Sequence, residues 1–207
     1  MMRLSIRTVA AAGLVLGSML ATASVGAEAL DLTYCITCHG ANGNGNSAIR
    51  APRIAGMEPW YLKRQLDAFA AGYRGVHPAD EAGQEMQPVA LRLKEAAITD
   101  KVIAFVGAFE AKAPVPTVTG DTARGKTLYA TCTACHGASG EGNSALNAPA
   151  LAERTDWYLV TQLKNFKTGV RGSDAADAPS AQMRAMAQSL TDEAAITDVV
   201  AYINTLR

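Results

Sequence analysis

The chain has 207 residues, with 19 lysines and arginines against 19 aspartates and glutamates, so its formal net charge is zero. Nucleic-acid binding needs a basic surface, and this balance offers none, so we expect no nucleic acid among its partners. The length is sufficient for two small domains.

The first 27 residues have the features of a secretory signal peptide. Arg3 and Arg7 form a positive region, an apolar run extends from Val9 to Leu20, and small residues lead to Ala27. The run is shorter than the ~20 residues that a membrane span needs, so we expect cleavage after Ala27. A retained membrane anchor is the alternative. Cleavage leaves 17 basic and 19 acidic residues, a net charge near −2.

The pentapeptide Cys-x-x-Cys-His occurs twice and uses all four cysteines. The first copy is Cys35, Cys38 and His39, and the second is Cys132, Cys135 and His136. This motif is the attachment signature of c-type haem, in which both thiols bond the porphyrin and the histidine binds the iron. We therefore expect two covalently attached haem c groups.

A zinc site and redox or structural disulfides are the alternative interpretations of these cysteines. Zinc ribbons usually separate their cysteine pairs by roughly 15–20 residues, whereas the two histidines here are 97 positions apart. Disulfides would leave both histidines unexplained.

The first half predicts a helix that begins with Pro59 and ends near Gly72, because proline suits the first helical position and glycine the end. Only about seven residues separate Ala27 from Cys35, so a helix before the first haem motif would be short. The segment 111–120 contains two prolines and predicts an extended, fairly stiff linker.

In the second half, Asp121 can cap a helix that runs to Cys132, and Thr155 or Asp156 can cap one that ends near Gly169. The last helix is expected to start at Thr191, and its apolar residues recur at helical spacing. Strand alternation is absent, so the pattern predicts an all-α fold.

The two halves are repeats of each other at a shift of 97 positions. Trp60-Tyr61-Leu62 falls on Trp157-Tyr158-Leu159, and Arg74-Gly75 falls on Arg171-Gly172. Solenoid repeats have periods of ~20–50 residues, so this longer repeat indicates a duplicated domain. The expected organisation is a signal peptide at 1–27, a domain at 28–110, a linker at 111–120 and a second domain at 121–207.

Matched methionines are candidates for the second axial ligand of each iron. Met86 and Met183 each follow the histidine of their haem motif by 47 residues, whereas Met57 and Met186 lack methionine counterparts. Methionine is usually packing material, but its recurrence at equivalent positions of two haem domains favours coordination through sulfur. His77 falls opposite an aspartate, which indicates a loop histidine.

The order Cys-x-x-Cys-His-Gly, proline, then methionine before an amphipathic C-terminal helix resembles class I cytochrome c. Two such domains behind a signal peptide resemble the diheme cytochrome c4 family, over essentially the whole mature chain. The resemblance implies two tandem class I cytochrome c domains, each wrapped around one covalent haem with His/Met ligation. It also implies that Pro52 and Pro149 offer backbone carbonyls to the ligand histidines.

Arg74 and Arg171 occupy equivalent positions and could pair with haem propionates, because guanidinium groups suit carboxylates. The alternative is a pair of exposed loop arginines.

The resemblance implies a periplasmic electron carrier that is not an enzyme. Its donor would be a quinol-oxidising complex or a dehydrogenase, and its acceptor a terminal oxidase or reductase, with peripheral association with membrane complexes. One alternative is a cytochrome subunit held in a periplasmic oxidoreductase complex. The other is a diheme enzyme with an exchangeable axial ligand, which the two matched methionines disfavour.

Overall fold

The computed structural model describes residues 31–206. The predicted signal peptide at 1–27 and residues 28–30 lie outside the described residues. In the described part of the segment before the first haem motif, residues 31–33 form a turn rather than the expected short opening helix, and the first helix begins only at Tyr34. Residues 31–206 are helical apart from loops and two isolated antiparallel bridges, which join Asn46 to Ala51 and Asn143 to Ala148. The predicted all-α fold is thus confirmed.

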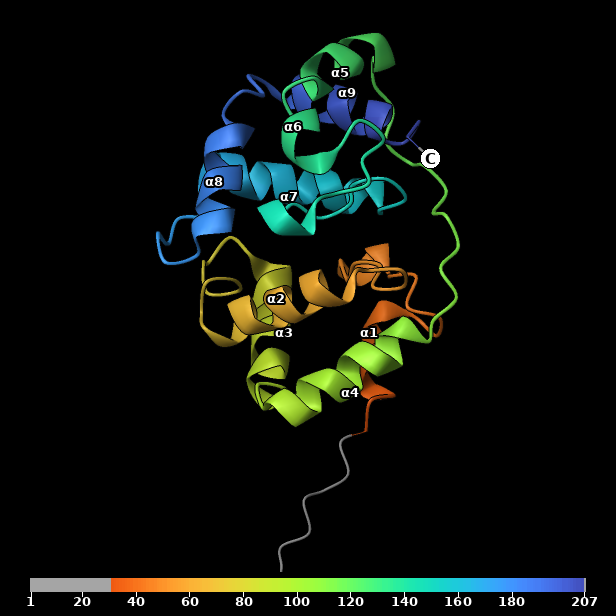
Figure 1. Ribbon diagram of the computed structural model, residues 1–207, viewed down its shortest axis with the longest axis vertical. Helices are drawn as coiled ribbons and strands as arrows, with labels where there is room; N and C mark the ends of the chain where they lie inside the picture. Colours follow the sequence, from red (N-terminus) through yellow and green to blue (C-terminus); the bar gives the residue numbers. More distant parts are fainter. Residues whose placement is uncertain (1–30, 207) are drawn as a thin grey trace, which may run out of the picture.

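The helices form two groups that lie one above the other along the longest axis (Figure 1). The first group consists of α1 (Tyr34–His39), η1 (Ser47–Ile49), α2 (Pro59–Ala70), α3 (Glu81–Arg92) and α4 (Ala96–Gly107). The second consists of α5 (Thr122–Tyr129), α6 (Thr133–His136), η2 (Ser144–Leu146), α7 (Asp156–Thr168), α8 (Ala178–Ala187) and α9 (Glu193–Ile203). In Figure 1, α2 and α7 lie on the sides where the two groups face each other.

Local capping explains where the expected helices begin and end. Pro59 is the first residue of α2, and α7 is followed by its C-cap Gly169, whose φ of 80° is one that glycine adopts without strain. Helix α5 stops at Tyr129, three residues before the predicted end at Cys132, because the chain turns there into α6. Helix α9 begins at Glu193 rather than Thr191, since the Asp192 carboxylate accepts the N–H of Ala195 and makes Asp192 the N-cap.

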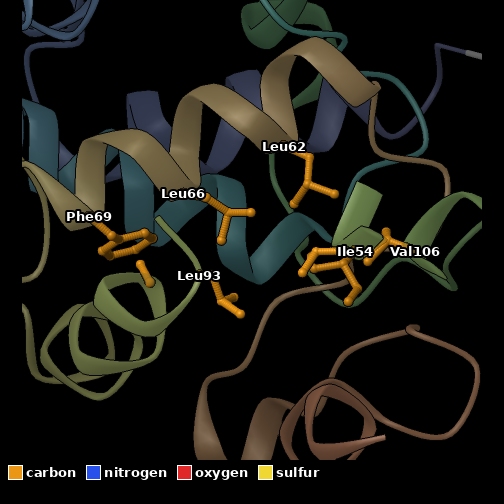
Figure 2. Packing of buried hydrophobic residues seen from close by; sticks show 8 residues of the cluster. Ile54, Leu62, Leu66, Phe69, Leu93 and Val106 are labelled. Carbon is orange, nitrogen blue, oxygen red and sulfur yellow. The ribbon is translucent and has the colours of Figure 1, made fainter. Parts of the chain in front are cut away.

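The core of the first half lies between α2, α3 and α4. Leu62, Leu66 and Phe69 recur along one face of α2 and point toward Leu93 and Val106, as Figure 2 shows. A matching cluster in the second half packs α9 against α5 and α7, with Ile196, Val199 and Val200 almost completely buried. Each helical group thus has its own hydrophobic core.

The tightest helix crossing in the second half is that of α5 with α9. Gly125 lies at this crossing, and a Cβ atom added to it would stand 2.7 Å from the carbonyl carbon of Asp198 and closer still to its oxygen. The Asp198 carboxylate accepts the N–H of Asp121 at 2.8 Å and pairs with Arg124 at 3.0 Å, so it ties the start of α5 to α9. The two helices can approach this closely only because residue 125 lacks a side chain.

None of the helices in residues 31–206 combines the length and the apolar character of a membrane span.

Candidate haem sites

Both haem motifs present their thiols and their histidine from a short helical segment. Cys35, Cys38 and His39 lie on α1, while Cys132 precedes α6, which carries Cys135 and His136. The four thiols are free and partly buried, and burial raises the pKa of Cys35 and of Cys132. Within residues 31–206 no three His, Cys, Asp or Glu side chains come together as a metal site, so the zinc alternative has no site there.

The two histidines are oriented in the same way. His39 Nδ1 lies 2.7 Å from the Pro52 carbonyl oxygen, and His136 Nδ1 lies 2.8 Å from that of Pro149. A carbonyl only accepts, so each Nδ1 carries the proton and each Nε2 keeps a free lone pair. Burial lowers the pKa of both imidazoles, against the opposing effect of these hydrogen bonds. Neutral imidazole with a free Nε2 is the form that binds iron.

A glycine-rich loop brings each proline next to its histidine. The N–H of Gly45 donates to the His39 carbonyl at 2.8 Å, and the N–H of Gly142 donates to that of His136 at 2.9 Å. Both glycines have φ above +80°, and a Cβ atom on Gly45 would stand 2.7 Å from the backbone nitrogen of Arg53. The backbone conformation and the close approach both require glycine.

A cavity that is partly open to solvent adjoins the second haem motif. Its wall includes Cys132, Cys135, His136 and Met183, together with apolar side chains of α7 and α9. The thiols, the free histidine lone pair and the apolar wall together fit a covalently attached haem.

The matched methionines lie on two helices that the sequence analysis did not anticipate. Met86 is on α3 and Met183 on α8, both are half-buried, and Met86 packs against the core of the first half. Met186 lies one turn after Met183 and lines the same cavity, although it is 42% exposed. Met57 of the first half lines this cavity too.

Arg74 and Arg171 are buried between the two halves, so the alternative of exposed loop arginines is wrong. They are 6% and 4% exposed, and each guanidinium stacks on a phenylalanine of its own half. Arg74 donates to Gln65 at 2.8 Å and to Gln162 at 3.3 Å, while Arg171 donates to Gln162 at 2.7 Å and to Gln65 at 2.6 Å. The four side chains form a ring across the interface.

This ring, which we call the arginine ring, lacks anions. No carboxylate in residues 31–206 lies within 4.0 Å of either guanidinium, and the Nε atoms of both arginines are buried without a hydrogen-bond partner. Burial, and then the neighbouring charge of Arg74, lower the pKa of Arg171. Two adjacent buried cations call for an anionic partner, which is the chemistry that haem propionates supply.

Several residues of the first half complete the second cavity and were not identified from the sequence. Arg53 is 5% exposed, lines the cavity, and has Nε and Nη2 without partners. Arg64 also lines it and pairs with Asp177, the N-cap of α8, at 3.2 Å. Glu58 does not line the cavity but pairs at 2.7 Å with Arg154, which does. The repeat could have revealed Gln65 and its counterpart, but these charged residues have unlike counterparts and left no such signal.

Known proteins resemble the chain across both halves. A family model described as Cytochrome c matches residues 23–108 and 122–207. A thiosulfate dehydrogenase electron acceptor from Stutzerimonas stutzeri is 34% identical over 164 residues, which are 77% of this chain and 73% of that protein.

Two solved structures share the fold. The structure of a cytochrome c4 from Acidithiobacillus ferrooxidans has a TM-score of 0.67 at 28% identity and covers 85% of this chain and 100% of its own. The structure of a thiosulfate dehydrogenase from Marichromatium purpuratum has a TM-score of 0.64 at 35% identity and covers 84% of this chain. The present chain spans only 36% of that larger protein.

Proposed function

We propose that the chain, which belongs to the cytochrome c family as a diheme protein that transfers electrons, is a periplasmic carrier. It would link a dehydrogenase to a terminal oxidase or reductase. The arginine ring is the observation that carries the proposal. It joins the two halves, each of which carries a complete haem motif. Such an arrangement brings two redox centres to one interface, as a relay needs.

We assign the covalent bonds and the iron ligands by the motif and the repeat. The thiols of each motif would attach the porphyrin, and His39 and His136 would bind the iron through Nε2. Met86 and Met183, at equivalent positions on α3 and α8, would each supply sulfur to the iron of their own half. When bound, the haem supplies a one-electron ferric–ferrous couple whose potential the protein sets through ligands, burial and hydrogen bonds.

The polypeptide holds both centres ready for exchange. Pro52 and Pro149 fix the ring orientation of the histidines, and the apolar wall of the cavity beside His136 would keep water away from a haem bound there. Arg74 and Arg171 would neutralise propionates of the two haems at the interface, since the Nε atoms of both arginines lack a partner. With a histidine and a methionine offered to each iron, no position would remain for a substrate, which favours a carrier over an enzyme.

The donor we favour is a periplasmic dehydrogenase that oxidises a sulfur compound such as thiosulfate. Two relatives support this choice: the electron acceptor of Stutzerimonas stutzeri and the thiosulfate dehydrogenase structure from Marichromatium purpuratum. The second of these also supports a role as a subunit fixed within such a complex. Co-purification with a larger catalytic subunit would distinguish the subunit from the free carrier.

A spectroelectrochemical titration with and without carbon monoxide tests the proposal. We expect two haems per chain, each titrating as a one-electron centre, and no carbon monoxide bound to either ferrous iron. Stopped-flow mixing with a reduced thiosulfate dehydrogenase should then reduce both haems in one rapid phase. Binding of carbon monoxide to the unaltered protein would contradict the carrier and favour the enzyme.

A further inference from the structure

A carboxylate of the first half contacts the peptide group that orients the ligand histidine of the second half. Glu58 is the N-cap of α2, and its Oε1 accepts the backbone N–H of Ala150 at 2.7 Å. That N–H belongs to the same peptide group as the Pro149 carbonyl, which accepts His136 Nδ1–H at 2.8 Å. One amide is therefore hydrogen-bonded at both ends, to an anion on one side and to a proposed iron ligand on the other.

From this arrangement we propose that Glu58 lowers the reduction potential of the second haem, acting through the Pro149–Ala150 peptide group on His136. The proposal rests on the assignment of His136 as an iron ligand. Glu58 is a positioning residue, because it touches neither the haem nor the iron ligand itself.

Linked hydrogen bonds polarise one another. An anion at the amide N–H shifts electron density toward the amide oxygen, which then accepts the Nδ1–H of His136 more strongly. A stronger bond at Nδ1 makes the imidazole a more basic ligand. A more basic ligand stabilises ferric over ferrous iron, so the potential falls.

Neighbouring groups hold the Glu58 side chain in place. Its second oxygen pairs with Arg154 Nη2 at 2.7 Å, and Arg154 Nη1 donates to the Gly56 carbonyl at 2.9 Å. These bonds hold the carboxylate against the peptide group. Both side chains are mostly buried, with exposures of 25% for Glu58 and 15% for Arg154, so solvent screens the interaction only in part.

The first half has no such contact, and the repeat therefore supplies an internal control. The counterpart of Ala150 is Arg53, whose backbone N–H makes no hydrogen bond within residues 31–206. The counterpart of Glu58 is Thr155, whose buried hydroxyl has no partner there. The counterpart of Arg154 is Met57. His39 thus keeps its bond to Pro52 without an anion behind it.

The experiment measures the potential of each haem in the loaded protein. Paramagnetic NMR during a redox titration follows the two haems separately, and it also reports the Nδ1 proton of His136. Glu58→Gln keeps an acceptor but removes the charge. The double variant Glu58→Thr with Arg154→Met places at both positions the residue types of their counterparts, so the Pro149–Ala150 peptide group has the same neighbours as the Pro52–Arg53 peptide group. It leaves the net charge of the protein unchanged. Glu153→Gln is the matched control, because Glu153 is exposed and only its backbone carbonyl makes a hydrogen bond, to Arg53.

We expect the potential of the second haem to rise in Glu58→Gln and in the double variant, while that of the first stays unchanged. If polarisation adds ~10–30% to a charge-assisted hydrogen bond, the ratio of oxidised to reduced second haem at fixed potential falls roughly 1.3- to 5-fold. At 59 mV per tenfold for one electron, this is a rise of ~7–40 mV. The Nδ1 proton signal of His136 should shift in the same variants.

Two results would overturn the proposal. One is an unchanged potential of the second haem in the double variant. The other is a rise of that potential in Glu153→Gln as large as in Glu58→Gln, because the through-space effect of a lost negative charge would then explain both. Failure of the ligand assignment is distinguishable from both, because the unaltered protein would then show no haem-bound signal from His136.

Discussion

Replacing Gly125 with alanine tests the close crossing of α5 and α9 in the second half. In an exposed helix this change stabilises by up to about 1 kcal/mol, because alanine has the higher helix propensity. Here the new methyl group would meet the carbonyl group of Asp198, with its nearest contacts at or below 2.7 Å. The neighbour is backbone of α9, which cannot rotate away as a side chain would, so the two helices have to separate.

The expected magnitude follows from these opposing effects. Overpacking of a close contact costs typically ~1–3 kcal/mol, and separation of α5 from α9 also weakens the contacts of Asp198 with Asp121 and Arg124. After subtracting the gain in propensity, we expect a net loss of about 2 kcal/mol. For a domain of this size each kcal/mol lowers the melting temperature by roughly 4–8 °C, so the second domain should melt well before the first.

Gly107→Ala is the matched control, because Gly107 ends α4 and a Cβ atom there would have no heavy atom within 4 Å. Urea unfolding of the loaded protein, followed by circular dichroism and by the haem bands, gives the free energies. Gly107→Ala should be neutral or more stable, and Gly125→Ala less stable, with early loss of the second haem's methionine-ligated spectrum. A Gly125→Ala protein as stable as the unaltered chain would refute the packing argument.

Four further outcomes are expected. Met86→Ala should open one iron to carbon monoxide and lower its potential, whereas Met186→Ala, at a 42% exposed position, should do neither; carbon monoxide difference spectra decide. Cys132→Ala should yield protein with one covalent haem by pyridine haemochrome assay. Arg171→Met should lower both potentials in a redox titration, because it removes a buried positive charge beside the propionates; unchanged potentials would contradict the propionate assignment. Asp156 accepts N–H groups of Thr117, Val118 and Trp157, and despite the opposing effect of burial these bonds hold its pKa below the ordinary value. The stabilisation that the Asp156 carboxylate gives is therefore present above ~pH 4 and lost as pH falls through its lower folded-state pKa. Asp156→Asn should lower the free energy of unfolding by ~1.5–3 kcal/mol in urea at neutral pH, and it should flatten the loss of stability between neutral and acid pH.

The sequence predicted the features that depend on local chemistry. Capping residues and apolar spacing placed α2, α7 and α9 to within two residues, since these signals act within one turn of helix. It did not predict α3 and α8. Helix α3 contains Gly83 and Pro88, two residues of low helix propensity. It is stabilised by the Asp80 cap and by packing against α2 rather than by its own composition.

The candidate site was predictable where the two halves match and hidden where they differ. Haem-motif residues and methionines recur at one spacing, so the repeat reveals them. Arg74 and Arg171 also recur, but their burial depends on how two domains meet, which no periodicity within either domain encodes. Glu58, Arg64 and Arg53 have unlike counterparts. Only the structure shows that Arg64 and Arg53 line the second cavity and that Glu58 bonds to Ala150 of its wall.

The interface has a two-fold symmetric centre and a rim that breaks the symmetry. In a dimer of identical domains every contact must be made twice by the same residues. Two copies of the first half would set Glu58 against Met57, and two copies of the second would set Arg154 against Thr155, so neither would reproduce the ion pair that joins the halves here. Because the two halves are parts of one chain, their sequences can differ, and a contact no longer has to be made twice by the same residues. The two halves are consequently not interchangeable. A chain built from two copies of the same half would lose the difference between its two haem-motif domains.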